Sequence, residues 1–344
     1  MTNALAYWAA LDCRPIAVVE DKGLEKILQI ALSDPMYELP CRKTVTKRVQ
    51  QLYDSEKGEK ENLLKKAECV AITGDHWTSV SNANYLGVTA HFIDNKWCLH
   101  SFALTIKKIT TRHFAENVAE DFESVTEAWE ITQKVTTIRT DSALVLTALR
   151  HLTRTMKASD DDPAYVVKFK AAFEKDLSQR EDALNYRFLQ VATALDPRFK
   201  DLKCLPRGER GEVWTSIEAL VQQQPGRATP ERTEEPARKR SLLLYNSDSD
   251  SEDEDGPKGA LARYKAEPTI SERDCPLQWW STHERAHPQL SVLARKYLGS
   301  PATSVPCERL FSLAGNIVQK KRAALSSENV NRLVCLSNWL KERK

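Results

Sequence analysis

Long apolar runs are missing from this sequence. No stretch approaches the roughly 18 consecutive apolar residues that a membrane-spanning helix needs, so we expect no transmembrane segment. The first residues, MTNALAYWAALDC, lack the basic cluster that opens a secretory signal peptide, and we expect none. The hydrophobic fraction of 41% still suffices for buried cores, and the length of 344 residues allows about two domains.

Paired cysteines are missing as well. None of the eight cysteines forms a Cys-x-x-Cys pair, which indicates free thiols in a reducing compartment. They are Cys13, Cys41, Cys69, Cys98, Cys204, Cys275, Cys307 and Cys335. The chain also has neither a Gly-rich loop that could cradle phosphates nor a nucleophile elbow, so these two catalytic classes have no motif here.

One pattern imitates a metal site. Residues 283–287, HERAH, match the zinc-protease pattern H-E-x-x-H, which needs both histidines on one face of a continuous helix. Pro288 follows at once and biases His287 away from helical geometry, and no third ligand is near in sequence. We interpret the match as coincidental and expect Trp279 and Trp280, just before it, to pack into a core.

The net charge of +2 conceals an uneven distribution. Residues 295–344 contain ten Lys and Arg against three Asp and Glu, whereas residues 247–255, SDSDSEDED, contain six acids and no base. A basic module beside an acidic tract suits a nucleic-acid partner, although a solvated charged face is the plainer interpretation.

Residues 1–66 favour helices. The spacing of apolar residues predicts a helix around residues 24–30 and a second helix after Pro40. The second helix and its lead-in carry four basic residues, Arg42, Lys43, Lys47 and Arg48. These are either an exposed charged face or contacts to DNA phosphates.

Residues 68–140 change from a helical to an alternating pattern. Three consecutive strands are predicted at residues 69–72, 85–93 and 97–106, with Asp94-Asn95 as a tight turn between the last two. A helix at about residues 113–129 and a fourth strand at residues 135–140 follow, and that strand ends on Asp141.

Strand, strand, strand, helix, strand is the order of an RNase H-like fold, in which strands one and four lie adjacent and parallel. We therefore predict an α+β chain with a partial RNase H-like fold of three antiparallel strands, a helix and a fourth strand. Helical N-terminal, insertion-derived and C-terminal parts surround it. Asp75, just past the first strand, is expected beside Asp141, just past the fourth.

The C-terminal residues 290–340 predict three amphipathic helices. The first covers residues 290–298 and stops at Gly299, the second begins after Ser304, and the third has Ser326 or Ser327 as its N-cap. Three short helices with so much apolar surface cannot cover one another, so either the rest of the chain or a second copy covers them.

Four segments carry a resemblance to a known family. They are residues 301–316 (PATSVPCERLFSLAGN) with Lys321, Arg322 and the helix at 333–339; residues 12–45; the ITGDHWTS around Asp75; and residues 192–202, ATALDPRFKDL. In this order they resemble hAT-superfamily transposases and the domesticated zinc-finger BED-type proteins derived from them. The first segment is similar to the hAT C-terminal dimerisation region.

The resemblance implies a catalytic triad at Asp75, Asp141 and Glu308. Three such carboxylates hold Mg²⁺ or Mn²⁺ for two-metal phosphoryl transfer. Each also has an ordinary interpretation, since Asp75 and Asp141 suit strand ends and Glu308 suits the first turn of a helix.

The chain departs from the family directly after Asp141. The expected fifth strand and Cys-x-x-His segment cannot be found, and residues 142–163 lead straight into helices at 164–177 and 186–195 that resemble the end of the family's helical insertion. An enzyme needs its ligands placed to within about 0.5 Å. We therefore expect a degenerate core that requires Mg²⁺ or Mn²⁺ only if it is active. No Cys pair with a His pair precedes residue 66, so we expect neither a BED finger nor structural zinc.

Residues 223–271 are predicted to be a disordered, charged linker. Arg238, Lys239 and Arg240 resemble a nuclear-localisation cluster, and three serines lie among acids that favour phosphorylation. Those serines are Ser247, Ser249 and Ser251. A plain solubilising spacer is the alternative.

These parts give five predicted regions. They are an N-terminal helical region (1–66), a partial RNase H-like domain (67–155), a helical insertion remnant (156–222), the linker (223–271) and the hAT dimerisation region (272–344). Dimerisation is expected through Leu310, Phe311, Leu333, Leu336, Trp339 and Leu340.

Three functions remain open from the sequence. The first is a transposase-derived nuclear protein, no longer an enzyme, that binds DNA or chromatin, regulates transcription, and forms a homodimer or pairs with a related hAT protein, without a membrane partner. The second is an active DDE transposase that cuts and transfers DNA strands. The third is a SUMO-ligase-like regulator of the BED family.

Overall fold

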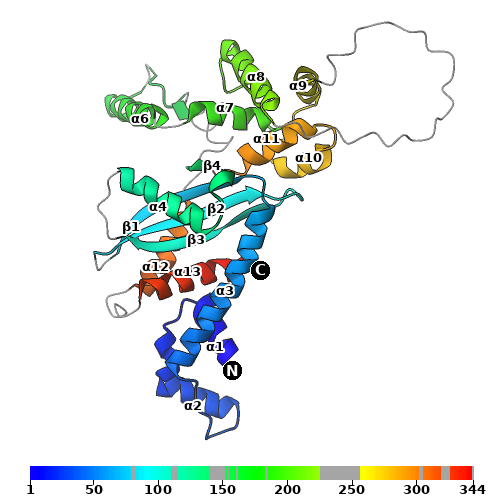
Figure 1. Ribbon diagram of the computed structural model, residues 1–344. Helices are drawn as coiled ribbons and strands as arrows, with labels where there is room; N and C mark the ends of the chain where they lie inside the picture. The colour runs from blue at the N-terminus through cyan, green and yellow to red at the C-terminus, as the bar shows by residue number, and fades with distance from the viewer. Residues whose placement is uncertain are drawn as a thin grey trace, which may run out of the picture. The chain divides into compact units, whose positions relative to one another are not determined.

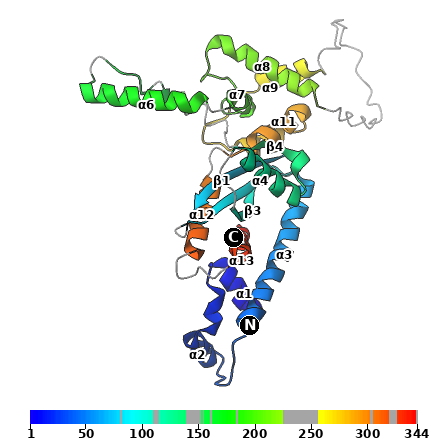
Figure 2. The ribbon, with the colours of Figure 1, turned by 60° about the vertical axis from the view of Figure 1, so that its left-hand side comes forward.

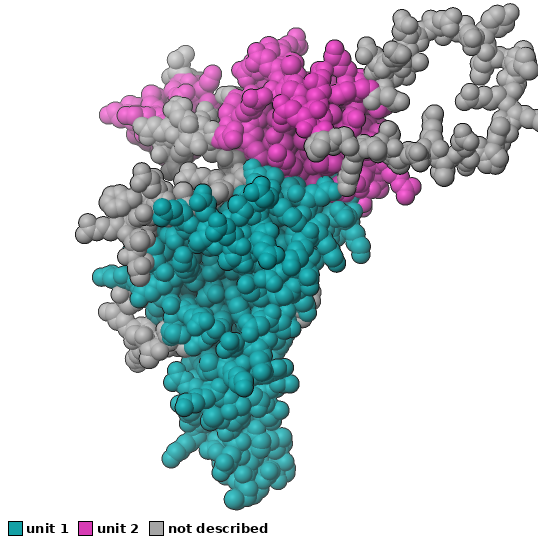
Figure 3. All heavy atoms as spheres, in the orientation of Figure 1, with its two compact units in different colours: residues 1–141, 299–344 teal, residues 142–298 magenta. Residues whose placement is uncertain are grey.

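The computed structural model describes residues 1–79, 82–109, 115–138, 152–153, 155–159, 162–182, 185–224, 256–301, 305–318 and 326–342. The chain divides into two compact units, coloured separately in Figure 3. Unit 1 combines Met1–Asp141 with Gly299–Lys344, and unit 2 is Ser142–Leu298. Both ends of the chain therefore belong to unit 1.

Unit 1 begins with helices. They are α1 (Thr2–Leu11), the 3₁₀ helix η1 (Ile16–Glu20), α2 (Lys22–Ala31) and α3 (Arg42–Lys66). The two helices predicted for this region are confirmed as α2 and α3. The 25-residue α3 ends on Lys65 and Lys66, whose charges are favourable at a helix C-terminus. This long helix connects the N-terminal helices to the sheet (Figure 1).

A four-stranded sheet in the order β3-β2-β1-β4 forms the centre of unit 1. Its strands are β1 (Val70–Thr78), β2 (Asn84–Ile93), β3 (Leu99–Ile109) and β4 (Val135–Ile138). The first three pair antiparallel, and β4 lies parallel to β1, with Val70 opposite Val135 and Ile72 opposite Ile138. The prediction of a partial RNase H-like α+β fold is confirmed, including the parallel first and fourth strands.

Two details of the predicted sheet are wrong. Asp75 lies inside β1, opposite Gly87 of β2, because the antiparallel ladder with β2 continues to Thr78. The connection between β2 and β3 is a loop closed by Asp94 N–H to the Cys98 carbonyl at 3.0 Å, and the Asp94 carboxylate accepts hydrogen bonds from two backbone N–H groups within it. The predicted two-residue turn at Asp94-Asn95 therefore does not form. A longer loop takes its place, because the Asp94 carboxylate binds backbone N–H groups within that loop.

Helices cover both faces of the sheet. The helix α4 (Ala115–Ala128) lies on one face and α12 (Val305–Ile317) on the other (Figures 1 and 2). Close approach requires two glycines: a Cβ on Gly74 would meet Phe122 of α4 at 2.3 Å, and one on Gly87 would meet Phe311 of α12 at 2.8 Å. The short η2 (Thr132–Lys134) leads from α4 into β4.

The last helix, α13 (Ser327–Lys341), covers the free edge of β3. Backbone N–H groups of Ala103 and Ile106 donate to the side-chain oxygens of Asn338 and Asn331 at 2.7 and 2.8 Å. The Trp339 indole N–H donates to the Ala103 carbonyl at 2.8 Å. An edge strand whose polar groups are satisfied in this way is protected from pairing with another chain.

Unit 2 is helical in its described part. It contains α6 (Ala164–Asp182), α7 (Tyr186–Leu195), α8 (Arg207–Gln222), α9 (Pro257–Ala266), α10 (Pro276–His283) and α11 (Pro288–Leu298). Trp280 and Tyr264 are fully buried at its centre and donate to the carbonyls of Leu195 and Ala194 at 2.9 and 3.2 Å. The prediction that Trp280 packs into a core is confirmed, whereas Trp279 is only partly buried. No helix within the described ranges is long and apolar enough to cross a membrane.

The predicted linker at 223–271 is wrong at its C-terminal end. Residues 257–266 form α9, which buries Ala260, Leu261 and Tyr264. The charged composition concealed this helix because its apolar residues gain their stability from α8 and α11, not from one another. Residues 225–255 lie outside the described part of the chain.

Candidate functional site

Asp75 projects from the α12 face of the sheet. It lies opposite Gly87, and the space over Gly87 is filled by Phe311 of α12. The Asp75 side chain is exposed, and its carboxylate accepts a hydrogen bond from the His76 backbone N–H at 2.7 Å. This strand therefore holds an exposed carboxylate directly beside α12.

Glu308 lies in the first turn of α12, as predicted, and is also exposed. The preceding residue, Cys307, is buried and attaches this turn to the sheet. Its Sγ lies 3.2 Å from Thr73 Oγ1 in β1 and 3.6 Å from Thr89 Oγ1 in β2. Since Thr73 and Asp75 are two residues apart in one strand, Asp75 and Glu308 lie on the same side of the sheet.

His91 completes a buried polar cluster under these carboxylates. Its Nε2 lies 2.8 Å from Thr89 Oγ1 and 3.3 Å from Thr73 Oγ1. Burial lowers the pKa of His91 to about 4, so the imidazole is neutral at pH 7. Burial, helped by the negative charge of Asp75, raises the pKa of the Cys307 thiol above its ordinary value. The cluster of Thr73, Thr89, His91 and Cys307 therefore carries no charge and is a hydrogen-bonded support for the start of α12.

Two of the three predicted ligands for a divalent cation lie within the described residues. Carboxylate oxygens suit Mg²⁺ and Mn²⁺, and Asp75 and Glu308 supply them on one side of the sheet. Asp141 lies outside the described residues, as does the chain that follows it up to residue 151. Among the described residues, no group of three or more His, Cys, Asp or Glu side chains could hold a metal ion.

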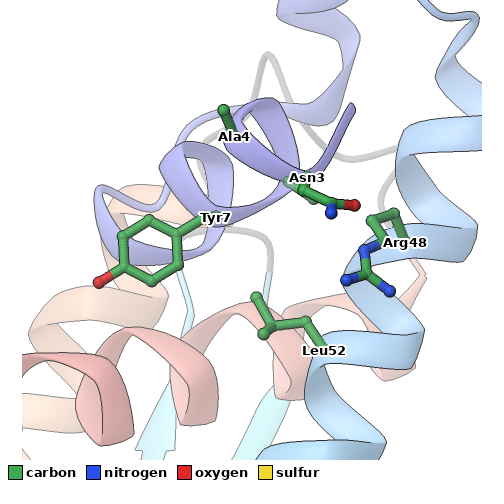
Figure 4. Close-up of a pocket in the computed structure, with 6 residues that line it drawn as sticks. Asn3, Ala4, Tyr7, Arg48 and Leu52 are labelled. Carbon is green, nitrogen blue, oxygen red and sulfur yellow. The ribbon is translucent and has the colours of Figure 1, made fainter. Parts of the chain in front are cut away.

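Basic side chains gather in the first half of α3. Arg42, Lys43 and Lys47 are exposed, and Arg48 is half-buried, with its guanidinium donating to Gln51 at 3.1 Å. Arg48 also lines a pocket of about 410 Å³ between α1 and α3, together with Asn3, Ala4, Ala6, Tyr7 and Leu52. In Figure 4, Asn3 and Arg48 project toward one another from the two helices.

Comparison with known families matches two parts of the chain. Residues 73–162 match the ZBED1 RNase-like domain, and residues 260–340 match the hAT family C-terminal dimerisation region. Each match covers one region of the chain, so the similarity is to these two domains.

Curated relatives agree with this assignment. A putative AC transposase of Zea mays is 30% identical over 110 residues, 32% of this chain and 14% of the relative. The putative transcriptional regulator tpeD of Talaromyces stipitatus is 25% identical over 130 residues, 38% of this chain and 15% of the relative. Zinc finger BED domain-containing protein RICESLEEPER 3 of Oryza sativa is 23% identical over 142 residues, 40% of this chain and 18% of the relative. The chain thus spans less than a fifth of the length of each.

The six apolar residues predicted to mediate dimerisation are buried within one copy of the chain. Exposed fractions range from 0% for Leu336 and Trp339 to 8% for Phe311, and Leu310, Leu333 and Leu340 lie between these values. They pack on the sheet, α1 and α3, so the rest of the chain covers these helices. In the described copy these six residues belong to the core, and their role in dimerisation stays a prediction.

Two further sequence motifs have clear outcomes. His283 ends α10 and His287 precedes α11, so the HERAH segment does not lie on one continuous helix, as expected from Pro288. Arg238, Lys239, Arg240 and the serines at 247, 249 and 251 lie outside the described residues.

The buried cluster at Thr73, Thr89, His91 and Cys307 was not predicted from the sequence. One signal was present: Thr89 and His91 are two positions apart, and therefore on one face, in an otherwise mainly apolar strand. Their partner Cys307 is more than 200 positions away in sequence. Only the packing of α12 on β1 and β2 brings these side chains together.

Proposed function

We propose that this chain is a transposase-derived nuclear protein that binds DNA, regulates transcription and self-associates. The observation that carries DNA binding is the basic first half of α3. The hAT dimerisation region and the relatives named as transposases and as a transcriptional regulator support the rest of the proposal.

The first half of α3 suits phosphate for two reasons. Residues 41–53 contain four basic residues and no acidic one. No side chain caps the start of α3 at Cys41, so backbone N–H groups and the positive end of the helix dipole lie beside Arg42 and Lys43. Both features attract a DNA backbone without reading its sequence.

Salt dependence of DNA binding tests this proposal. In the full chain, Arg42, Lys43, Lys47 and Arg48 are changed to alanine, and binding to a fluorescent duplex is measured by anisotropy at several salt concentrations. Each lost phosphate contact lowers the slope of log affinity against log salt by about 0.9, so we expect a loss of up to about 3.6.

A matched control removes the same charge elsewhere in unit 1. The exposed residues Lys65, Lys66, Lys96 and Lys108 are changed to alanine together. Affinity and slope should stay near those of the unmodified chain. An equal loss in both variants would show that only net charge matters and would refute the role of α3.

Metal-dependent DNA strand cleavage is a second candidate. It is favoured by one observation: Asp75 and Glu308 lie on the same side of the sheet, where α12 begins. Mg²⁺ or Mn²⁺ would supply the chemistry by activating the attacking oxygen and stabilising the leaving one. The test is nicking of duplex DNA by the full chain with each metal. Loss of nicking in Asp75→Asn and in Glu308→Gln is expected, and nicking that persists in both would exclude this site.

A further inference from the structure

The helix α6 of unit 2 (Figures 1 and 2) carries aromatic side chains that the described part of the chain leaves uncovered. Tyr165, Phe169 and Phe173, which we call the α6 stripe, are four residues apart and therefore lie on one face of the helix. Tyr165 is 74% and Phe169 60% exposed, and the rings of Phe169 and Phe173 stack with centroids 6.2 Å apart. None of residues 164–175, the part of α6 with described side chains, is buried. Clustered exposed apolar side chains indicate a contact surface.

Lysines border the α6 stripe. Lys168 and Lys175 are exposed and seven residues apart, so they lie along the same side of α6, next to the stripe. On the other side of the stripe, Lys170 forms an ion pair with Asp162 at 2.6 Å. Glu174 lies away from the stripe by the same helical periodicity. The stripe therefore suits a segment in which apolar residues stand next to acidic ones.

One segment of this chain has that composition. Residues 242–245, LLLY, are the only run of four apolar residues within 225–255, and residues 247–255, SDSDSEDED, follow with six acids. The segment 225–255 joins α8 to α9, which belong to the same unit as α6. Leu242 comes 18 residues after Gln224, and a chain of that length spans up to about 60 Å at full extension. That reach is about twice the length of the 19-residue α6.

A second apolar segment has the wrong charge for this site. Residues 143–156, ALVLTALRHLTRTM, precede α6 closely in the sequence and contain two arginines and no acid. Docked on the stripe, they would place positive charge beside Lys168 and Lys175, and like charges in contact are unfavourable. Charge complementarity therefore selects residues 242–255.

We propose that residues 242–255 dock on the α6 stripe of the same chain. The apolar run 242–245 covers the aromatic rings, and the acids that follow lie beside Lys168 and Lys175. The contact removes the rings from water and neutralises an acidic tract that would otherwise repel a DNA backbone. The inference does not depend on the proposed function, which is carried by α3 in unit 1.

Zero-length cross-linking of the full chain tests the docking. A water-soluble carbodiimide joins a lysine amine directly to a carboxylate, and mass spectrometry locates the joined residues. We expect cross-links from Lys168 and Lys175 to the acids of residues 248–255. Lys258, exposed and close to the tract in sequence, gives a reference yield that does not require docking.

Two double variants remove the apolar contact and leave every lysine and acid in place. Tyr165→Ser with Phe169→Ser removes the stripe, and both side chains are too exposed for the change to unfold the chain. Leu242→Ser with Leu244→Ser removes the apolar run. Each should lower the cross-link yield, relative to the reference, at least about tenfold, because burial of one large apolar side chain corresponds to at least that factor. Val167→Ser, at a 36% exposed residue on the far side of α6, is the matched control and should leave the yield unchanged.

The contrary results are distinct. An unmodified chain without these cross-links refutes the docking. Equal yields in the unmodified chain and in both double variants would show that charge alone attracts the tract, and would refute the stripe as its site. In an equal mixture of ¹⁴N- and ¹⁵N-labelled chains, cross-links that join one label to the other would show that the segment comes from a second copy, which overturns docking within one chain. Each of these failures leaves DNA binding through α3 untouched.

Discussion

Replacement of Trp339 tests whether the last helix, α13, belongs to the core of one chain or to a dimer interface. The Trp339 side chain has no exposed surface, stacks on Tyr53 with ring centroids 5.2 Å apart, and meets the edge of Trp129 at 6.2 Å. Its indole N–H also satisfies the carbonyl of Ala103 on the edge strand.

The cost of Trp339→Ala has two parts. Removing a buried aromatic side chain costs about 3 to 5 kcal/mol, mainly through lost burial and the cavity that remains. Leaving the Ala103 carbonyl without its donor adds about 1 to 3 kcal/mol. Trp339→Phe keeps most of the ring and loses the hydrogen bond, so its destabilisation should be about 1 to 3 kcal/mol, the cost of the unpaired carbonyl.

Urea unfolding of the full chain, followed by circular dichroism, measures both variants. We expect the order unmodified, Trp339→Phe, Trp339→Ala in decreasing stability, with Leu99→Ala near the unmodified chain because Leu99 is 53% exposed. A Trp339→Ala chain of unchanged stability but altered oligomeric state would refute the assignment of Trp339 to the core.

Two further predictions concern the sheet. Gly87→Ala should destabilise the chain by about 1 to 3 kcal/mol, because its Cβ would lie 2.8 Å from Phe311, and adding Phe311→Leu should recover part of the loss in the same unfolding assay. His91 has a pKa of about 4 when folded against an ordinary value of 6.5, so its contribution is complete above pH 6.5 and is lost as the pH falls toward 4. The unmodified chain should lose about 3 kcal/mol more than His91→Asn over that interval, and parallel stability curves would contradict the burial of a neutral His91.

The sequence alone predicted the helices and strands that depend on local pattern and on the order of elements along the chain. Helical spacing of apolar residues predicted α2, α3, α4 and the three C-terminal helices, and Ser326 is the N-cap of α13, accepting a hydrogen bond from the Asn329 N–H. Alternation gave the three antiparallel strands. The parallel pairing of β1 with β4 followed from the order of the elements.

The sequence alone did not predict the features that depend on contacts between distant segments. The apolar pattern of α13 is as consistent with packing on a second copy as with packing on its own chain. In the described copy α13 packs on the edge of β3, whose backbone polar groups hydrogen-bond to Asn331, Asn338 and Trp339. The extent of β1 past Asp75 depends on its partner β2. The helix α9 is too short and polar to be evident without its neighbours.

The candidate site divides in the same way. The sequence by itself predicted Asp75 and Glu308 through the resemblance of their motifs to a known family, and the basic residues of α3 through composition, because motifs, charged types and helix positions are local properties. The tertiary structure decided that α12 begins beside Asp75, that Cys307 joins Thr73, Thr89 and His91, and that Ile27 and Ile30 of α2 stay exposed. Burial and contact depend on which surfaces meet in three dimensions, and a one-dimensional pattern gives each surface without its partner.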